Sequence, residues 1–125
     1  MTEAQTTLAR RAVACKGFRW VRGMLRHDGY RYVGSGLWAR WSDTALSSGV
    51  LTALHMPEQY PDLTDAATVG CLLALVREAW SDPFLCAVGD PDTGWRIDAV
   101  TAQVQDLHGY ASEAEALVFA LERLP

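Results

Sequence analysis

The apolar positions between residues 65 and 80 recur at helical spacing and predict an amphipathic helix, the clearest element of the chain. Its core-facing stripe consists of Val69, Leu72, Leu73, Val76 and Trp80. Thr64 or Asp65 can accept hydrogen bonds from the free backbone N–H groups at the start of the helix. Ser81-Asp82-Pro83 ends it, because proline has no backbone N–H to donate. We therefore expect Leu72 and Val76 to be buried against a sheet.

Two further segments show weaker helical spacing. In residues 3–16, Leu8, Ala12 and Cys15 share a face, and Gly17 follows the segment. That stripe is narrow, so we expect a peripheral helix. In residues 112–123, Ser112 and Glu115 have the spacing of a capping box. The apolar stripe of this last helix consists of Leu117, Ala120, Leu121 and Leu124.

Alternating aromatic or β-branched and polar residues predict strands on both sides of the central helix. Before it, the turn sequences Asp28-Gly29 and Gly34-Ser35-Gly36 separate strands near residues 20–26, 30–34 and 37–42. Residues 43–63 form a long connection, with a short strand or turn near 50–55. After the helix, residues 84–89 and 95–105 form a hairpin around residues 90–94. The apolar face of its second strand changes parity at Ala99-Val100, which predicts a β-bulge.

These elements predict a single α+β domain over residues 1–125, in the order α-β-β-β-loop-α-β-β-α, with helices packed on an antiparallel sheet. Hydrophobic residues make up 50% of the chain, which excludes an intrinsically disordered protein. No apolar run approaches the roughly 20 residues of a membrane helix. The first 16 residues also lack the hydrophobic stretch of a signal peptide. We therefore expect a cytoplasmic protein with no membrane partner.

The net charge of −4 conceals a segregation of charge along the chain. Residues 10–40, the basic segment, hold eight of the eleven basic residues and one acid. Residues 41–125, the acidic remainder, hold thirteen acids and three basic residues. This pattern is compatible with an anion-binding surface, but it also arises when the two parts pair with each other, within one fold or across a dimer. The second interpretation is favoured.

No motif nominates a catalytic or metal-binding residue. The three cysteines, Cys15, Cys71 and Cys86, form no zinc-type cluster, and we expect them to be structural thiols. His27, His55 and His108 are scattered without nearby ligands at metal spacing. The stretch Asp90–Gly94 has the oxygen-rich start of a calcium loop but lacks the distal glutamate, so a turn is favoured. We expect neither an enzyme nor a bound cofactor or metal.

Arginine alternates with aromatic residues in three places: Phe18-Arg19-Trp20, Tyr30-Arg31-Tyr32 and Trp38-Ala39-Arg40-Trp41. Aromatic rings can stack on bases while guanidinium groups contact phosphates, so this pattern is compatible with a nucleotide-binding sheet. The candidate ligand-binding residues are Arg19, Trp20, Arg22, Arg31, Trp38 and Arg40. Strand alternation alone, with one face in the core and the other in solvent, produces the same pattern and is favoured. The isoelectric point near 5.2 argues against non-specific nucleic-acid binding.

Parts of the chain resemble small uncharacterised proteins encoded by tailed phages and prophages. The resemblance is carried by residues 61–80, PDLTDAATVGCLLALVREAW, and more loosely by the openings FRWVRGM (18–24) and SEAEALV (112–118). The helix–hairpin–helix half also resembles the phage ABA sandwich domain. The resemblance implies a phage or prophage origin and an α/β sandwich, and it supplies no catalytic residues. Residues 43–60 depart from it.

Three functional hypotheses follow. The first is an accessory binding protein that engages a host or phage protein in the host cytoplasm, most concretely as an inhibitor of a host defence system or host enzyme. The second is sequestration of a nucleotide or other small anionic signalling ligand by the arginine–aromatic strands. The third, an enzyme, is the least favoured. Open sheet edges and segregated charge also predict a homodimer.

Overall fold

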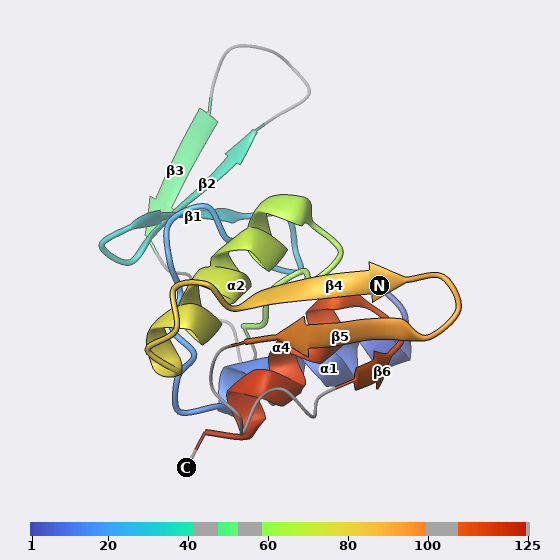
Figure 1. Ribbon diagram of the computed structural model, residues 1–125. Helices are drawn as coiled ribbons and strands as arrows, with labels where there is room; N and C mark the ends of the chain where they lie inside the picture. Colours follow the sequence, from blue (N-terminus) through green and yellow to red (C-terminus); the bar gives the residue numbers. More distant parts are fainter. Residues whose placement is uncertain (42–47, 53–58, 100–107, 125) are drawn as a thin grey trace.

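The computed structural model describes residues 1–41, 48–52, 59–99 and 108–124, and all structural statements below concern these residues. The predicted α+β class is confirmed, because helices and antiparallel strands follow one another along the chain (Figure 1). The elements are α1 (Glu3–Ala14), β1 (Arg31–Gly34), β2 (Leu37–Trp41), β3 (Ser48–Thr52), α2 (Ala66–Ala79), β4 (Cys86–Asp90), β5 (Gly94–Asp98), β6 (His108–Tyr110) and α4 (Glu113–Glu122). The strands form two separate three-stranded antiparallel sheets, β1-β2-β3 and β4-β5-β6.

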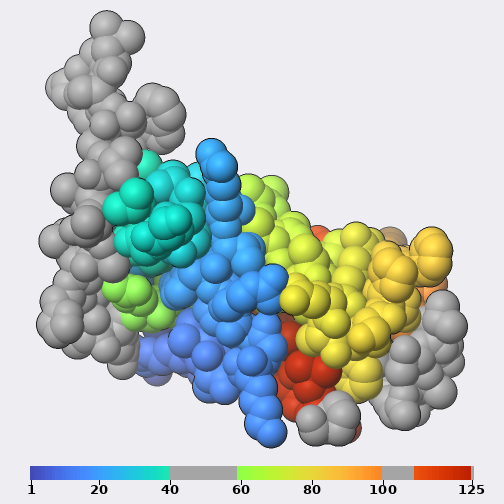
Figure 2. All heavy atoms as spheres, turned by 90° about the vertical axis from the view of Figure 1, so that its left-hand side faces the viewer, coloured from blue at the N-terminus to red at the C-terminus, as the bar shows by residue number. Residues whose placement is uncertain are grey.

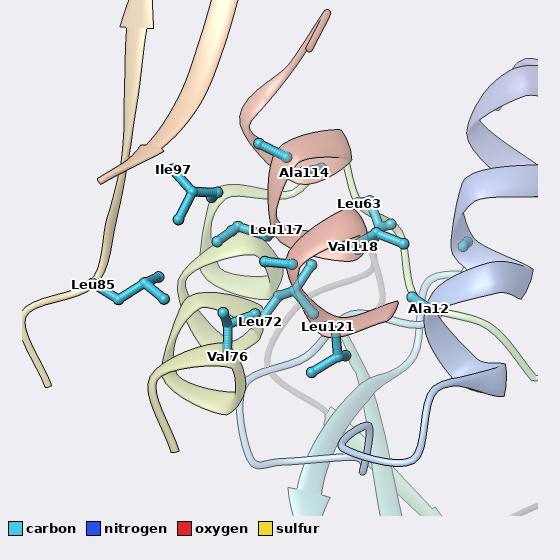
Figure 3. Packing of buried hydrophobic residues seen from close by; sticks show 13 residues of the cluster. Ala12, Leu63, Leu72, Val76, Leu85, Ile97, Ala114, Leu117, Val118 and Leu121 are labelled. Atoms are coloured by element: carbon cyan, nitrogen blue, oxygen red, sulfur yellow. The ribbon is translucent and has the colours of Figure 1, made fainter. Parts of the chain in front are cut away.

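Helix α4 forms the centre of the core. In Figure 3 it runs between α2 on one side and α1 on the other. Leu85 and Ile97, on the side of β4 and β5, belong to the same core cluster. Burial extends well beyond its predicted stripe and includes Ala114, Ala116, Leu117, Val118, Ala120 and Leu121. The helix is thus enclosed on nearly every side. Ser112 caps it by accepting a hydrogen bond from the Glu115 backbone N–H, as its sequence predicted.

Helix α2 agrees closely with its prediction. Asp65 is the N-cap, with its carboxylate accepting from the Thr68 backbone N–H at 3.0 Å. Leu72 and Val76 are fully buried, but the prediction that they pack on a sheet is wrong, because α2 packs mainly on α4. Leu75, outside the predicted stripe, is buried as well. The Trp80 indole N–H donates to the Ala120 carbonyl at 2.8 Å, so the end of α2 is fastened to α4. Val69 and Leu73, which belong to the same predicted stripe of α2, are partly buried.

The sheet β4-β5-β6 covers α4 with one face. Ile97 and Ala87 point inward, whereas Arg96 and Asp98 lie on the exposed face, as strand alternation requires. The hairpin was predicted, but β6 was not. The observed register irregularity lies between Trp95 and Arg96 in the β5–β6 pair. The β-bulge predicted at Ala99-Val100, and the rest of the predicted strand to residue 105, lie at or beyond the edge of the described residues.

The sheet β1-β2-β3 projects away from the three helices (Figure 1). The two predicted turns at residues 28–29 and 34–36 are present, with Gly29 and Gly34 at positive φ. The strand predicted at residues 20–26 is wrong, because Gly23 adopts φ +106° and only isolated bridges at Leu25 and Arg26 follow it. Within the long connection predicted over residues 43–63, a short strand or turn was expected near 50–55. The structure has strand β3 at Ser48–Thr52, and residues 53–58 lie outside the described part.

Helix α1 begins with a capping box that the sequence analysis did not identify. The Thr2 hydroxyl accepts from the Gln5 N–H, and the Gln5 side chain accepts from the Thr2 N–H. Ala9 and Ala12 are its fully buried residues, while Leu8 and Cys15 are half-buried. Gly17 follows the helix where a Cβ atom would lie only 2.9 Å from a Leu121 methyl carbon. The glycine therefore permits the chain to pass close to α4.

Candidate functional site

An aromatic cluster surrounds Trp38, which is buried in β2 at 2% exposure. The Trp20 and Tyr32 rings meet it edge-on, with centroid distances of 4.8 and 5.1 Å. Phe18 in turn meets Trp20 edge-on at 5.6 Å. Four aromatic residues of the predicted ligand-binding segments, Phe18, Trp20, Tyr32 and Trp38, therefore contact one another, and Trp38 presents no free face for stacking on a base.

Arg26 lies against this cluster, and the sequence analysis missed it. Its side chain is 1% exposed, and its Nε and Nη2 atoms donate to the two oxygens of Asp28 at 2.6 and 2.8 Å. The guanidinium carbon lies 4.7 Å from the Trp38 ring centroid and 4.9 Å from that of Tyr30. No described residue accepts a hydrogen bond from Nη1. Burial is the largest influence on the pKa of Asp28 and raises it, but the hydrogen bonds and the positive charge of Arg26, with smaller contributions, together leave that pKa below its ordinary value.

The predicted arginines do not converge on one site. Arg31 donates to the Gly23 carbonyl at 2.7 Å and to both carboxylate oxygens of Asp65, at 3.1 and 3.3 Å. Hydrogen bonds from Arg31 lower the pKa of Asp65. Arg19 pairs with Glu78 on α2 at 2.7 Å, and both side chains are exposed.

The two remaining predicted arginines are Arg22 and Arg40. Arg22 is exposed. Arg40 pairs with Gly49 across β2 and β3, and its side chain lies outside the described part of the structure.

Three of the described ion pairs link the basic segment to the acidic remainder, whereas the Arg26–Asp28 pair lies within the basic segment. Arg11 pairs with Glu122 on α4, in addition to the pairs of Arg19 and Arg31 with residues of α2 and its cap. These contacts confirm, for three of the basic residues, that the two parts of the chain pair within one fold. In Figure 2, part of the basic segment, in blue, lies beside the green-to-yellow residues of α2.

Two described hollows near these arginines are lined by charges of both signs. Arg19 lines a hollow of about 340 Å³ with Lys16 and Phe18, but Glu78 lines the same hollow. A hollow of about 620 Å³ lies where α1 and α4 begin, and its charged lining includes Glu3, Arg11 and Glu115. Since carboxylates accompany the cations in both places, neither hollow has the charge that a phosphate requires.

The cysteines and histidines occupy structural positions where they are described. All three cysteines are free thiols, and burial raises the pKa of Cys15 and Cys71, which disfavours the reactive thiolate. His27 stacks on Tyr60 at 3.9 Å, His55 lies outside the described residues, and His108 begins β6. Within the described ranges, no group of three metal-ligating side chains occurs.

A second surface surrounds Phe84, a large apolar side chain that is 78% exposed. Beside this residue is a shallow hollow of about 540 Å³, lined by Ala74, Arg77, Glu78, Ser81, Asp82 and Pro83. Strand β4 follows directly and pairs only with β5, so its other edge has no described strand partner. We call Phe84, this hollow and β4 the Phe84 surface. The sequence signal for it was Phe84 itself, an aromatic residue immediately after Pro83 and before the strand.

The turn that carries Phe84 is held by hydrogen bonds on both sides. The Phe84 N–H donates to Asp82 Oδ1 at 3.0 Å, and the Asp82 N–H donates to the Arg77 carbonyl at 2.9 Å. The Arg77 Nε donates to the Leu85 carbonyl at 2.6 Å, which fastens the other side of the turn to α2. Phe84 is therefore presented to solvent from a fixed backbone.

No helix in the described ranges has the length and apolar character needed to cross a bilayer. Comparisons with protein-family models, curated proteins and solved structures found no match for this chain.

Proposed function

We propose that this protein acts by binding another protein, and that the Phe84 surface is its binding site. The observation that carries the proposal is Phe84 itself, a side chain that is 78% exposed on a hydrogen-bonded turn. Aromatic side chains dominate binding energy when a partner buries them in a pocket. Because its backbone is already ordered, Phe84 would lose little conformational freedom on binding.

The open edge of β4 supports the same proposal. The strand consists of Cys86, Ala87, Val88, Gly89 and Asp90. An unpaired strand edge without charged residues along its middle is a template for an added strand, since natural edges are usually protected by lysine, proline or a bulge. We therefore expect the partner to add an extended segment beside β4 while a pocket in the partner receives Phe84.

The charge of the hairpin defines the chemistry of the partner. Asp90, Asp92 and Asp98 are exposed, and no described cation forms an ion pair with them. Together with the net charge of −4, they favour a partner segment that carries lysine or arginine. Opposite charge across an interface accelerates association, and such acceleration weakens as salt increases.

The finer form of this proposal is an accessory protein of phage or prophage origin that inhibits a host defence system or host enzyme. It is supported by the resemblance of residues 61–80 to small phage proteins. It also agrees with the sequence analysis, in which no motif nominates a catalytic residue. Sequestration of a nucleotide through Arg19 and Arg31 has less support, because each of these arginines already has a carboxylate partner.

A quantitative capture experiment tests the proposal. The wild-type protein, Phe84→Ala and Val13→Ala are each immobilised and exposed to the same bacterial lysate. Val13 on α1 is the matched control, since it is also an exposed apolar residue, at 37%. We expect one protein to be retained by the wild-type and Val13→Ala chains and lost with Phe84→Ala. Equal retention by all three chains would contradict the assignment of the surface.

A further inference from the structure

Arg26 has hydrogen-bonding capacity that the described fold does not use. The three nitrogens of a guanidinium group form a triangle, and the Nε–Nη2 edge of Arg26 faces Asp28. The Nη1 corner, with two N–H groups, therefore points away from Asp28. Nη1 is buried and has no described acceptor. Buried donors are almost always satisfied, so an unpaired charged donor at 1% exposure requires an explanation.

Two neighbouring arginines whose side chains are described, Arg31 and Arg19, differ from Arg26 in this respect. Arg31 uses both terminal nitrogens on Asp65 and the Gly23 carbonyl, and its side chain is 37% exposed. Arg19 is exposed at 57%, so water can satisfy its remaining N–H groups. Besides Asp28 and the two aromatic rings, the described contacts give Arg26 no further hydrogen-bond acceptor, and its side chain is closed to solvent.

The free edge of Arg26, formed by Nη1 and the second hydrogen of Nη2, has the geometry of a fork. Such a fork donates two parallel hydrogen bonds to the oxygens of one carboxylate or phosphate group. Trp38 and Tyr30 lie close to the guanidinium group and restrict approach to it.

We infer that Arg26, held by Asp28 beside Trp38 and Tyr30, is the recognition group of a site for a small oxyanion, a carboxylate or a phosphate. Asp28 positions the guanidinium group and leaves the opposite edge for the ligand. This site is separate from the Phe84 surface and does not depend on the proposed protein partner.

Nuclear magnetic resonance of the arginine side chains in the full-length chain tests the inference. Sodium formate and inorganic phosphate are titrated separately, because small probes can reach a buried group, and sodium chloride at equal ionic strength is the control. We expect a saturable shift of the Arg26 Nη1 and Hη1 signals and no comparable shift at Arg31. A response to formate alone identifies a carboxylate site, and a response to phosphate alone identifies a phosphate site.

The Arg26→Lys variant provides a second readout, since lysine keeps the charge and loses the fork. We expect its affinity for the effective probe to fall about tenfold or more, whereas Arg31→Lys leaves the affinity unchanged. If Arg26→Lys does not fold, the wild-type signals still decide the question. The inference is overturned if Arg26 responds to neither oxyanion, responds equally to chloride, or shows an Hη1 signal already hydrogen-bonded and unmoved by either probe.

Discussion

The Arg31 guanidinium contacts Asp65, the residue that caps α2, so a single carboxylate joins the sheet β1-β2-β3 to α2. Asp65 accepts from the Thr68 N–H and hydroxyl at 3.0 and 2.8 Å and from Arg31 at 3.1 and 3.3 Å. The Thr68 hydroxyl in turn accepts from the Leu25 N–H at 2.8 Å. One hydrogen-bonded network therefore links the segment 23–31, strand β1 and the start of α2.

Two substitutions at Asp65 separate its two roles. Asn keeps the capping oxygen and loses the negative charge, so Asp65→Asn should cost less than about 1 kcal/mol of unfolding free energy, because the ion pair is partly exposed. Asp65→Ala also removes the cap and should cost about 1 kcal/mol more. Urea unfolding at pH 7 measures both values. Equal losses for the two variants would show that the cap contributes nothing.

The same pair predicts a pH dependence. Hydrogen bonds from Arg31 hold the pKa of Asp65 below its ordinary value, so the charged carboxylate is favoured in the folded state. Its stabilisation is complete above the unfolded pKa, about pH 4, and is lost as the pH falls through the lower folded pKa. The difference in unfolding free energy between wild type and Asp65→Asn should therefore shrink below about pH 4. A difference that stays constant from pH 7 to pH 2 would contradict this account.

Leu72 tests the packing of α2 in the core. Its side chain is fully buried, so Leu72→Ala should reduce the free energy of unfolding by about 2–5 kcal/mol. Leu73→Ala is the control, because Leu73 is only partly buried and should lose less. Chemical denaturation of the two variants provides the comparison. A loss below about 1 kcal/mol at Leu72 would mean that another face of α2 is buried.

Gly94 and Gly36 form a matched pair for the effect of steric contact. Both have positive φ, +79° and +75°, so alanine is strained by about 1–2 kcal/mol at each. At Gly94 a Cβ atom would also lie 2.7 Å from the Tyr110 carbonyl oxygen, whereas nothing lies within 4 Å at Gly36. Gly94→Ala should therefore cost about 1–3 kcal/mol more than Gly36→Ala. The loss of stability is measured by thermal unfolding. Equal losses for the two variants would contradict the close approach of Gly94 to β6.

The helices were predictable because their signals are local. Asp65 and Ser112 are strong N-caps. The apolar positions chosen by helical spacing, Leu72 and Val76 in α2 and Leu117 in α4, are buried in the fold. The sequence did not show that α4 is enclosed on nearly all sides, since alanines such as Ala114 and Ala116 contribute little to an apolar stripe. Such burial depends on how the other elements pack around α4.

The strands and the candidate site were less predictable, because both depend on tertiary contacts. Strand β6 has three residues, too few for an alternating pattern. Residues 20–26 begin with the apolar pair Trp20-Val21, yet the positive φ of Gly23 interrupts the predicted strand. Arg26 was missed because charged residues are rarely buried, and only the folded chain places it between Asp28 and Trp38.

The sequence predicts a homodimer, partly from its segregated charge, and the structure changes that part of the argument. Arg11, Arg19 and Arg31 find their carboxylates within the chain, so charge pairing between chains is not needed to explain the segregation of charge. A dimer would instead use an open strand edge, and its mass should not fall with added salt. Light scattering at low and moderate salt measures this. A dimer that dissociates into monomers with salt would contradict the pairing described here.

Site-specific photo-crosslinking tests the proposed protein-binding function most directly. A benzoyl-phenylalanine replaces Phe84 in one chain and Val13 in another, and both are irradiated in the same bacterial lysate. The account predicts a crosslink from position 84, and not from position 13, to one other protein through a peptide rich in lysine or arginine. A chain that crosslinks at position 84 only to its own copies, to nothing, or to the same proteins as position 13 would contradict it.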